Sequence, residues 1–227
     1  MSAVDEHHQV VDRLAGKIIG IIGGTGPQGR GLARRFADSG LQVVIGSRSA
    51  DRAEAAAAEL GSSVRGATNE DCAETADIVL VTVPWEGHRS QVEALAKELA
   101  GKVVVDCVNP LAFDKMGPFA PSVPEGSAAE QAQMLLADAT VVAAFHHLSA
   151  VVLLDDEVAS LDADVMVVGD DREATNLVQD LAGRIAGCRG VYAGRLRNAG
   201  QVEALTANLI AINKRYKAHA SLRVTDI

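Results

Sequence analysis

The chain has 227 residues, of which 48% are apolar but only 3% aromatic, and its formal net charge is −9. This composition allows one large α/β domain, or a nucleotide-binding domain with a smaller second one, around an aliphatic core. The acidic balance argues against binding to nucleic acid or to anionic membranes. Residues 1–15 lack the apolar core of a signal peptide, and no apolar run is long enough to span a bilayer. We therefore expect a cytoplasmic protein without nucleic-acid or membrane partners.

Short apolar runs alternate with amphipathic runs along most of the chain. After an apolar run that begins at Lys17, the sequence predicts strands over residues 42–45, 63–65, 77–83, 102–106, 140–144, 165–168 and 190–192. The predicted helices lie over residues 32–37, 50–60, 69–76, 88–100, 127–138, 171–187 and 201–218. This order predicts an α/β fold: a Rossmann-type, doubly wound and mainly parallel sheet with a smaller C-terminal α/β part.

Residues 109–126 interrupt this alternation and hold four of the six prolines. A long irregular segment in a compact domain is usually functional, for example as a lid over a site. A surface connection between two subdomains explains the segment equally well. The sequence leaves both interpretations open.

A glycine-rich stretch follows the first apolar run and opens an amphipathic one. It fits the pattern G-x-G-x-x-G with the residues Gly24, Thr25, Gly26, Pro27, Gln28 and Gly29. In a dinucleotide-binding fold the first glycine permits the tight turn, the second lets the backbone approach a pyrophosphate, and the third lets the helix pack on the strand. Free N–H groups at the helix start then face the phosphate charge. The position of the motif between strand and helix predicts a dinucleotide site.

The end of the second predicted strand indicates which dinucleotide is bound. NAD sites usually have Asp or Glu there, to accept a hydrogen bond from the ribose 2′-hydroxyl. This chain instead has Ser47 and Arg48, with Arg52 one helical turn later. A hydroxyl and two guanidinium groups suit a 2′-phosphate, which predicts NADP. The alternative is that both arginines are solvated charges beside Asp51 and Glu54.

The chain resembles the coenzyme F-420-dependent NADP oxidoreductases in several stretches. These are residues 23–33 (GGTGPQGRGLA), 44–48 (VIGSR), 69–71 (NED), 82–86 (TVPWE), 168–171 (VGDD), 193–194 (AG) and 202–206 (VEALT), with His146, Ala150 and Asn198. The stretches 82–86 and 202–206 are not general to nucleotide-binding folds. The resemblance spans nearly the whole chain from Lys17.

The resemblance implies reversible hydride transfer between the reduced deazaflavin F-420 and NADP, in a homodimer. It implies a flexible N-terminal extension (1–16), an NADP-binding Rossmann domain (17–145) and a smaller C-terminal domain that completes the cleft (146–227). By position, NADP is expected to contact the glycine loop and the 2′-phosphate residues named above. The further expected cofactor contacts are Val83, Pro84, Asn109, Ala150 and Leu222 near the nicotinamide half, and His146 on the deazaflavin side. Pro27 stands where the family often has Asn, so one donor to the pyrophosphate is lost.

Direct hydride transfer between two rings needs no acid or base on the protein, because the cofactors carry the chemistry. The sequence has no obvious triad, metal-ligand spacing or paired carboxylates, so we expect no catalytic residue and no metal. The alternative role of His146 is a strand-end histidine bonded to a neighbouring backbone carbonyl. Trp85 is expected to pack in the core, and His88 to begin a helix.

Two other functions remain open at this stage. One is an NADPH-dependent reductase of a flavin or of a small imine or carbonyl, although such enzymes usually need a proton donor. The other is a non-catalytic NADP-sensing module. The last predicted helix has an apolar stripe at helical spacing, which either lines a homodimer interface or packs within the chain.

Overall fold

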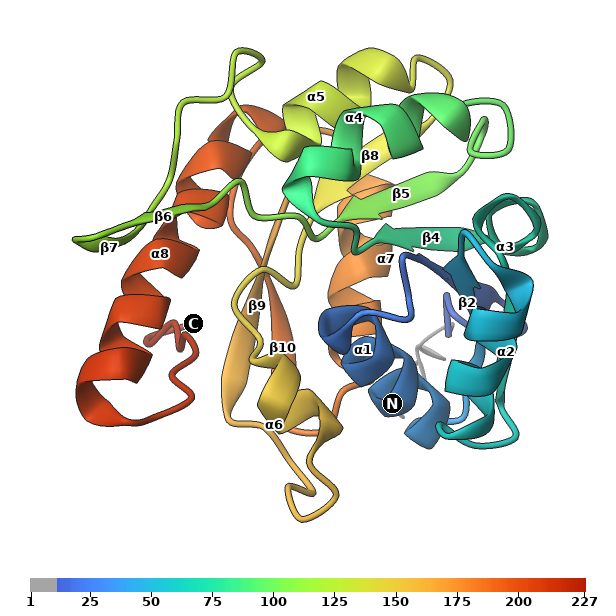
Figure 1. Ribbon diagram of the computed structural model, residues 1–227, viewed down its shortest axis with the longest axis horizontal. Coiled ribbons are helices and arrows are strands. Elements are labelled where there is room, and N and C mark those ends of the chain that lie inside the picture. Colours follow the sequence, from blue (N-terminus) through green and yellow to red (C-terminus); the bar gives the residue numbers. More distant parts are fainter. Residues whose placement is uncertain (1–11) are drawn as a thin grey trace, which may run out of the picture.

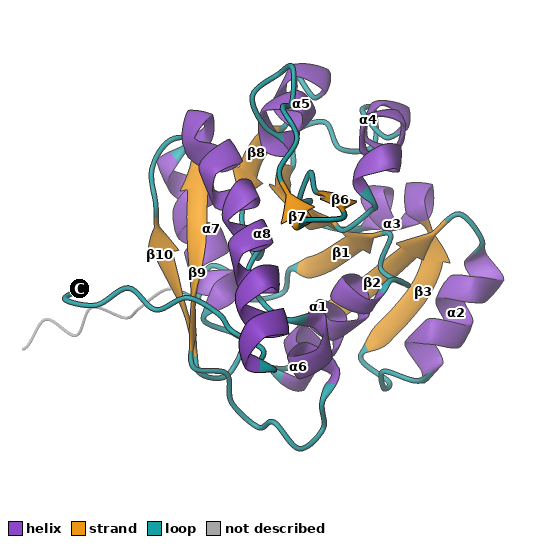
Figure 2. Ribbon diagram, turned by 60° about the vertical axis from the view of Figure 1, so that its left-hand side comes forward, coloured by secondary structure: helices purple, strands orange, loops and turns teal. Residues whose placement is uncertain are grey.

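A computed structural model describes residues 12–227 of the chain (Figure 1). Its centre is one eight-stranded sheet with the strand order β10-β9-β8-β5-β4-β1-β2-β3. Helices cover both faces of this sheet (Figures 1 and 2). The predicted α/β fold with a Rossmann-type, mainly parallel sheet is confirmed.

Five parallel strands and four helices form the Rossmann half. The strands are β1 (Ile18–Ile22), β2 (Gln42–Ser47), β3 (Val64–Thr68), β4 (Ile78–Val81) and β5 (Val103–Asp106). The helices are α1 (Pro27–Asp38), α2 (Ala50–Ala58), α3 (Asn69–Thr75) and α4 (Trp85–Ala94). All four residues of β4 are buried, as expected for a central parallel strand that is covered on both faces.

The sheet reverses direction in its C-terminal part. Strand β8 (Thr140–Ala143) continues the parallel set beside β5, but β9 (Ala163–Gly169) runs antiparallel to β8. Strand β10 (Cys188–Tyr192) is parallel to β9. Only the last two residues of β9 pair with β8, so the rest of β9 extends beyond the C-terminal ends of the parallel strands. This extension forms one wall at the edge of the sheet where dinucleotides bind.

Four more helical segments pack around this second part. They are α5 (Ala128–Leu135), α6 (Ala150–Leu154), α7 (Arg172–Ala182) and α8 (Ala199–Tyr216), with a 3₁₀ turn at Leu196–Asn198 before α8. Two aliphatic clusters fill the two faces of the sheet. One lies under α1, α2, α6 and α7, and the other lies under α3, α4, α5 and α8.

Several expected elements differ from the structure. The helix expected over 88–100 begins at Trp85 and ends at Ala94, so the prediction that His88 begins it is wrong. The segment 109–126 contains a small hairpin, β6 (Ala112–Asp114) and β7 (Gly117–Phe119), which lies beside α8 (Figure 1). Helix α6 was not predicted, because five residues are too few to show helical periodicity.

The N-terminal extension predicted over residues 1–16 lies only partly within the described residues. Residues 1–11 lie outside the described range, but residues 12–16 are tied to the domain. Leu14 is 1% exposed in the core, Asp12 pairs with Arg184, and Arg13 pairs with Asp180. The division at residue 145 remains a prediction, and both of its parts contribute strands to the same sheet. Within residues 12–227, no helix combines the length and the apolar character that crossing a membrane requires.

Candidate functional site

The glycine loop joins the end of β1 to α1 at the C-terminal edge of the parallel strands. Gly23 has a φ of 71°, which favours glycine, and its N–H donates to the Asn69 side chain at 3.2 Å. The Gly24 N–H donates to the carbonyl of Gly46 at 2.9 Å. The loop is therefore bonded to the end of β2 and to the start of α3 before any ligand binds.

Two glycines of the motif are required by close packing, and one is not. A Cβ on Gly29 would lie 2.6 Å from the Gly24 Cα and 2.8 Å from the Thr82 hydroxyl. A Cβ on Gly24 would lie 2.7 Å from the Ile21 carbonyl oxygen. Around Gly26, in contrast, the only atom within 4 Å of an added Cβ is the Gly23 oxygen at 3.5 Å. The loop thus packs tightly against the fold and is open on the side where a pyrophosphate would approach.

Pro27 occupies the first position of α1, where it removes one N–H but is well suited to the helix. Across the described residues, no protein acceptor is found for the N–H groups of Thr25, Gln28 and Gly29. These donors lie at the positive end of the α1 dipole and fit a phosphate anion. The Gln28 side chain does not replace the lost donor, because its amide donates instead to the Phe145 carbonyl at 3.2 Å.

The predicted 2′-phosphate residues lie together where β2 passes into α2. Ser47 is 7% exposed at the end of β2, whereas Arg48 and Arg52 are exposed. The Ser49 hydroxyl caps α2 by accepting from the Arg52 N–H. Within residues 12–227, neither Arg48 nor Arg52 has a carboxylate within 4.0 Å, so both guanidinium groups are available to an anion.

A second group of predicted residues meets around the end of β8. The Asn109 amide donates to the His146 carbonyl at 3.3 Å. The Thr206 hydroxyl of α8 lies 3.0 Å from the Asn109 side-chain oxygen and 3.3 Å from the same carbonyl. The sequence analysis identified Thr206 only as part of the stretch 202–206. In the structure its hydroxyl contacts both Asn109 and the His146 carbonyl.

The two adjacent histidines have different environments. His147 donates from Nε2 to the Val202 carbonyl at 2.7 Å, whereas both ring nitrogens of His146 are buried without a partner in the described part of the chain. The bond to a backbone carbonyl that the alternative interpretation expected for His146 is therefore made by His147 instead. Burial, with a smaller contribution from His147, lowers the pKa of His146 to about 3, so its ring is neutral at physiological pH. An unsatisfied buried ring is costly and is suited to a ligand that completes its hydrogen bonds.

A buried polar network lies behind this group. His88 Nε2 is 2.7 Å from a carboxylate oxygen of Asp106, and its Nδ1 is 2.9 Å from the side-chain oxygen of Gln131. The Gln131 amide nitrogen donates to Glu125, which fixes that orientation. Both ring nitrogens thus face oxygen atoms, an environment that favours the protonated ring. Burial alone lowers the pKa of His88, but the bond to Asp106 and its charge outweigh burial and raise it.

This network supports the chain at the end of β5. The other Asp106 oxygen accepts the N–H of Val108 at 3.0 Å, one residue before Asn109. The Trp85 ring lies 5.5 Å from the His88 ring and packs partly against the core. Sequence reasoning missed the network because His88, Asp106 and Gln131 are far apart in the chain and belong to three different elements.

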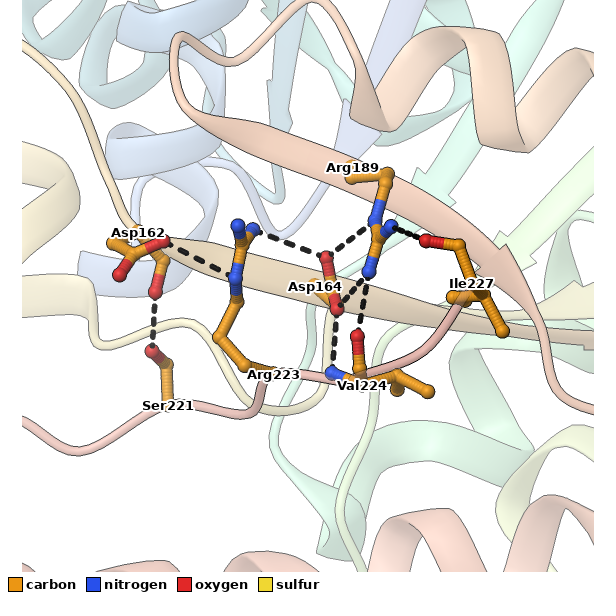
Figure 3. Close-up of polar contacts among 7 residues, drawn as sticks. All are labelled: Asp162, Asp164, Arg189, Ser221, Arg223, Val224 and Ile227. Carbon is orange, nitrogen blue, oxygen red and sulfur yellow. Dashed lines mark hydrogen bonds and ion pairs between the residues drawn. The ribbon is translucent and has the colours of Figure 1, made fainter.

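The C-terminal tail is bonded to the projecting half of β9. Asp164, on the projecting half of β9, accepts two bonds from Arg189, one from Arg223 and one from the Val224 N–H at 2.6 Å (Figure 3). Arg189 also donates to the carbonyls of Val224 and Ile227. These bonds lower the pKa of Asp164 to about 2, with Arg189 as the main cause. The tail is thereby held along β9.

The other predicted contacts are placed less closely. A Cβ on Gly23 would lie 2.9 Å from the Val83 side chain, so Val83 borders the glycine loop. Pro84 is exposed at the N-cap of α4, and Ala150 begins α6. The Leu222 carbonyl accepts the Asp164 N–H at 2.7 Å, but no hydrogen bond joins it to the other predicted residues. The roles of these residues in binding remain predictions.

Comparison with known proteins decides the family. A model described as "NADP oxidoreductase coenzyme F420-dependent" matches residues 18–110. The "F420-dependent NADP reductase" of Methanothermobacter thermautotrophicus is 38% identical over 221 residues, which cover 92% of this chain and 95% of that protein. The chain belongs to this family.

Further relatives agree with membership of the F420-dependent NADP reductase family. The protein of the same name from Methanocaldococcus jannaschii is 37% identical over 92% of this chain and 98% of its own length. A crystal structure from Arthrobacter sp. FB24, assigned as an F420-dependent NADP reductase, has a TM-score of 0.77 at 28% identity. The superposition covers 92% of this chain and 99% of the Arthrobacter chain. The predicted resemblance is confirmed over nearly the full length.

Proposed function

We propose that the chain catalyses reversible hydride transfer between NADP(H) and the deazaflavin coenzyme F-420. The observation that carries this proposal is the likeness to F420-dependent NADP reductases over 92% of the chain. The site fits it, because the open glycine loop and the group around His146 lie at the same edge of the sheet. Gln28 joins them directly through its bond to Phe145.

On the NADP side, the unpartnered N–H groups at the start of α1 would hold the pyrophosphate. Ser47, Arg48 and Arg52 would hold the 2′-phosphate, as their position at the end of β2 suggests. Asn69 and Thr82 act indirectly, because they fix the loop and the packing of α1 on it. This chain thus binds and orients NADP without supplying a reacting group.

On the deazaflavin side, the neutral ring of His146 could both donate and accept one hydrogen bond. Asn109 and Thr206 hold its backbone, and the hairpin β6–β7 beside α8 offers apolar side chains, of which Phe113 is 67% exposed. This hairpin favours the interpretation of residues 109–126 as a cover over the site. The two bound rings supply the hydride chemistry, and the protein holds them at reacting distance and excludes water.

One assay separates the candidate functions. NADPH is mixed with the protein and with F-420, riboflavin or FMN in turn, and absorbance is followed. Turnover with F-420 alone supports the proposal. Turnover with riboflavin or FMN alone favours the flavin reductase, and binding of NADPH without turnover favours the sensing module.

A homodimer and a cytoplasmic location remain predictions. Part of the apolar stripe on α8 packs within the chain, since Val202 and Leu209 are buried. The same helix also exposes Ile212 and Tyr216, 41% and 73% respectively, which supports an interface on its C-terminal half. Light scattering on the purified protein would give a dimer mass if this proposal holds and a monomer mass if it does not.

A further inference from the structure

Helix α1 carries a buried guanidinium near its C-terminal end. Arg35 is 8% exposed and donates to four backbone carbonyls in a single segment. Its Nε donates to Leu153 at 2.8 Å, Nη1 to Val158 at 2.7 Å, and Nη2 to Val152 at 2.8 Å and Asp155 at 3.0 Å. Within residues 12–227, no carboxylate lies within 4.0 Å of this guanidinium. Four of the five N–H donors of this buried cation are therefore directed at backbone oxygens.

Those oxygens belong to the end of α6 and the turn after it. The last carbonyls of any helix lack partners within the helix and carry its negative dipole end. A five-residue helix such as α6 is also too short to be stable alone. Arg35 gives the Leu153 and Val158 carbonyls a donor and supplies the matching charge. It adds a second donor to the Val152 and Asp155 carbonyls, which already accept backbone N–H groups. The conformation of α6 thus depends on a side chain of the NADP-binding helix.

Other contacts along α1 fix the same segment. Next to Arg35, the Nη1 of Arg34 donates to the Leu154 carbonyl at 3.0 Å. At the start of the helix, Gln28 bonds to the carbonyl of Phe145, whose φ of 66° is unusual for a non-glycine residue. In the middle, a Cβ on Gly31 would lie 2.6 Å from the Leu153 Cβ, so the two helices pack closely. Further along, the ring of Phe36 meets the ring of Phe145 edge-on at 5.9 Å between centroids.

We propose that Arg35 is a positioning residue for the reaction, because it sets the deazaflavin side of the cleft relative to the NADP helix. The segment 145–158 includes His146, on the side proposed for F-420, and Ala150, expected near the nicotinamide half. The start of α1 holds the pyrophosphate, and Arg35 holds the far end of the segment to the same rigid helix. Because both contacts are made by α1, this one helix sets the distance between the two bound rings. This inference rests on the proposed function only for the identity of the second ring.

The test uses Arg35→Met and Arg35→Lys, with Lys102→Met as a matched control. The Lys102 ammonium donates to the carbonyls of Ala73, Glu74 and Ala76 at 2.6 to 2.8 Å. It therefore holds the C-terminal end of α3 as Arg35 holds α6, but on the opposite face of the sheet. Both changes remove a cation from helix carbonyls, so both are expected to lower stability.

We expect Arg35→Met to raise amide exchange across residues 150–158 by about tenfold or more, as losing bonds to a charged group implies. The NADPH dissociation constant should stay within about twofold of wild type, whereas kcat with F-420 should fall by about ten- to a hundredfold, the order expected for misplaced reactants. Arg35→Lys should recover part of kcat, since an ammonium reaches some of the same oxygens. Lys102→Met should change neither the exchange of 150–158 nor kcat.

The proposal is overturned if Arg35→Met leaves exchange of 150–158 unchanged, or if both Met variants reduce kcat equally. If Arg35→Met does not fold, the same comparison is made with Arg35→Lys alone, which keeps the charge but loses the planar fork. A failure of the proposed function is separate. In that case wild type does not turn over F-420, and the exchange measurement still decides whether Arg35 holds the segment.

Discussion

The buried carboxyl of Glu203 gives the most direct test of the electrostatics of this fold. Glu203 lies on α8, is 2% exposed, and accepts the N–H groups of Ala128 and Ala129 at the start of α5. Burial raises its pKa, the two N–H groups and His88 lower it, and the charge of Asp106 raises it. The result is a pKa of about 7 instead of the usual 4.5.

A carboxyl with a raised pKa in the folded state costs stability as pH rises. The contribution of Glu203 is fully present below pH 4.5 and is lost as pH approaches about 7. Between pH 5 and 8 this difference amounts to about 2 to 3 kcal/mol in the free energy of unfolding. Glu203→Gln removes the titration but keeps an oxygen that accepts one N–H bond.

Urea unfolding followed by circular dichroism at pH 5, 6, 7 and 8 measures this effect. The stability of Glu203→Gln relative to wild type should rise by about 2 to 3 kcal/mol across that range. A difference that stays constant within about 0.5 kcal/mol, which is larger than the expected experimental scatter, would show that the helix N-terminus keeps Glu203 ionised throughout. The assigned pKa, and the dominance of burial behind it, would then be wrong.

Three further changes test the site. Arg48→Ala should raise the KM for NADPH by about ten- to a hundredfold and barely affect NADH, because it removes a bond to a charged group; an equal loss for both cofactors contradicts the NADP assignment. Gly29→Ala places a Cβ 2.6 Å from the Gly24 Cα. A fluorescence titration with NADPH should therefore show binding weakened by about tenfold or more. Unchanged affinity for NADPH would refute the packing argument. Asp164→Asn should release the tail and speed tryptic cleavage after Arg223 (Figure 3). Wild type should show the same release as pH falls from about 4 toward 2, because the pKa of Asp164 is lowered to about 2. Trypsin is inactive at this pH, so pepsin replaces it, and tail protection that persists at pH 2 argues against this carboxylate as the anchor.

The NADP half of the site could be predicted because its parts are close in sequence or tied by a rule of topology. The glycine loop directly follows β1, and the end of β2 must lie beside it when the two strands are parallel neighbours. The hydrogen bond from the Gly24 N–H to the Gly46 carbonyl joins the glycine loop directly to the end of β2. Ser47 and Arg48, where β2 passes into α2, are therefore the residues that the sequence predicts for the 2′-phosphate.

The second half depended on contacts that no local pattern reveals. The identical neighbours His146 and His147 differ because the backbone turn at Phe145 sends one ring to the Val202 carbonyl and buries the other unpartnered. The adjacent Arg34 and Arg35 both reach the end of α6, but Arg35 is buried and bonds to four carbonyls, whereas Arg34 is partly exposed and bonds to the Leu154 carbonyl alone and to the carboxylate of Asp156.

The sequence by itself indicated the Rossmann order and NADP, because strand periodicity, the glycine turn and the residues after the second strand are local properties of the chain, and its resemblance to known proteins indicated the family. Only the tertiary structure decided the reversal of β9, the placement of His88 between Asp106 and Gln131, and the attachment of α6 to α1. Those features require groups that are distant in the chain to lose their water together, and the free energy of doing so depends on the packed fold as a whole.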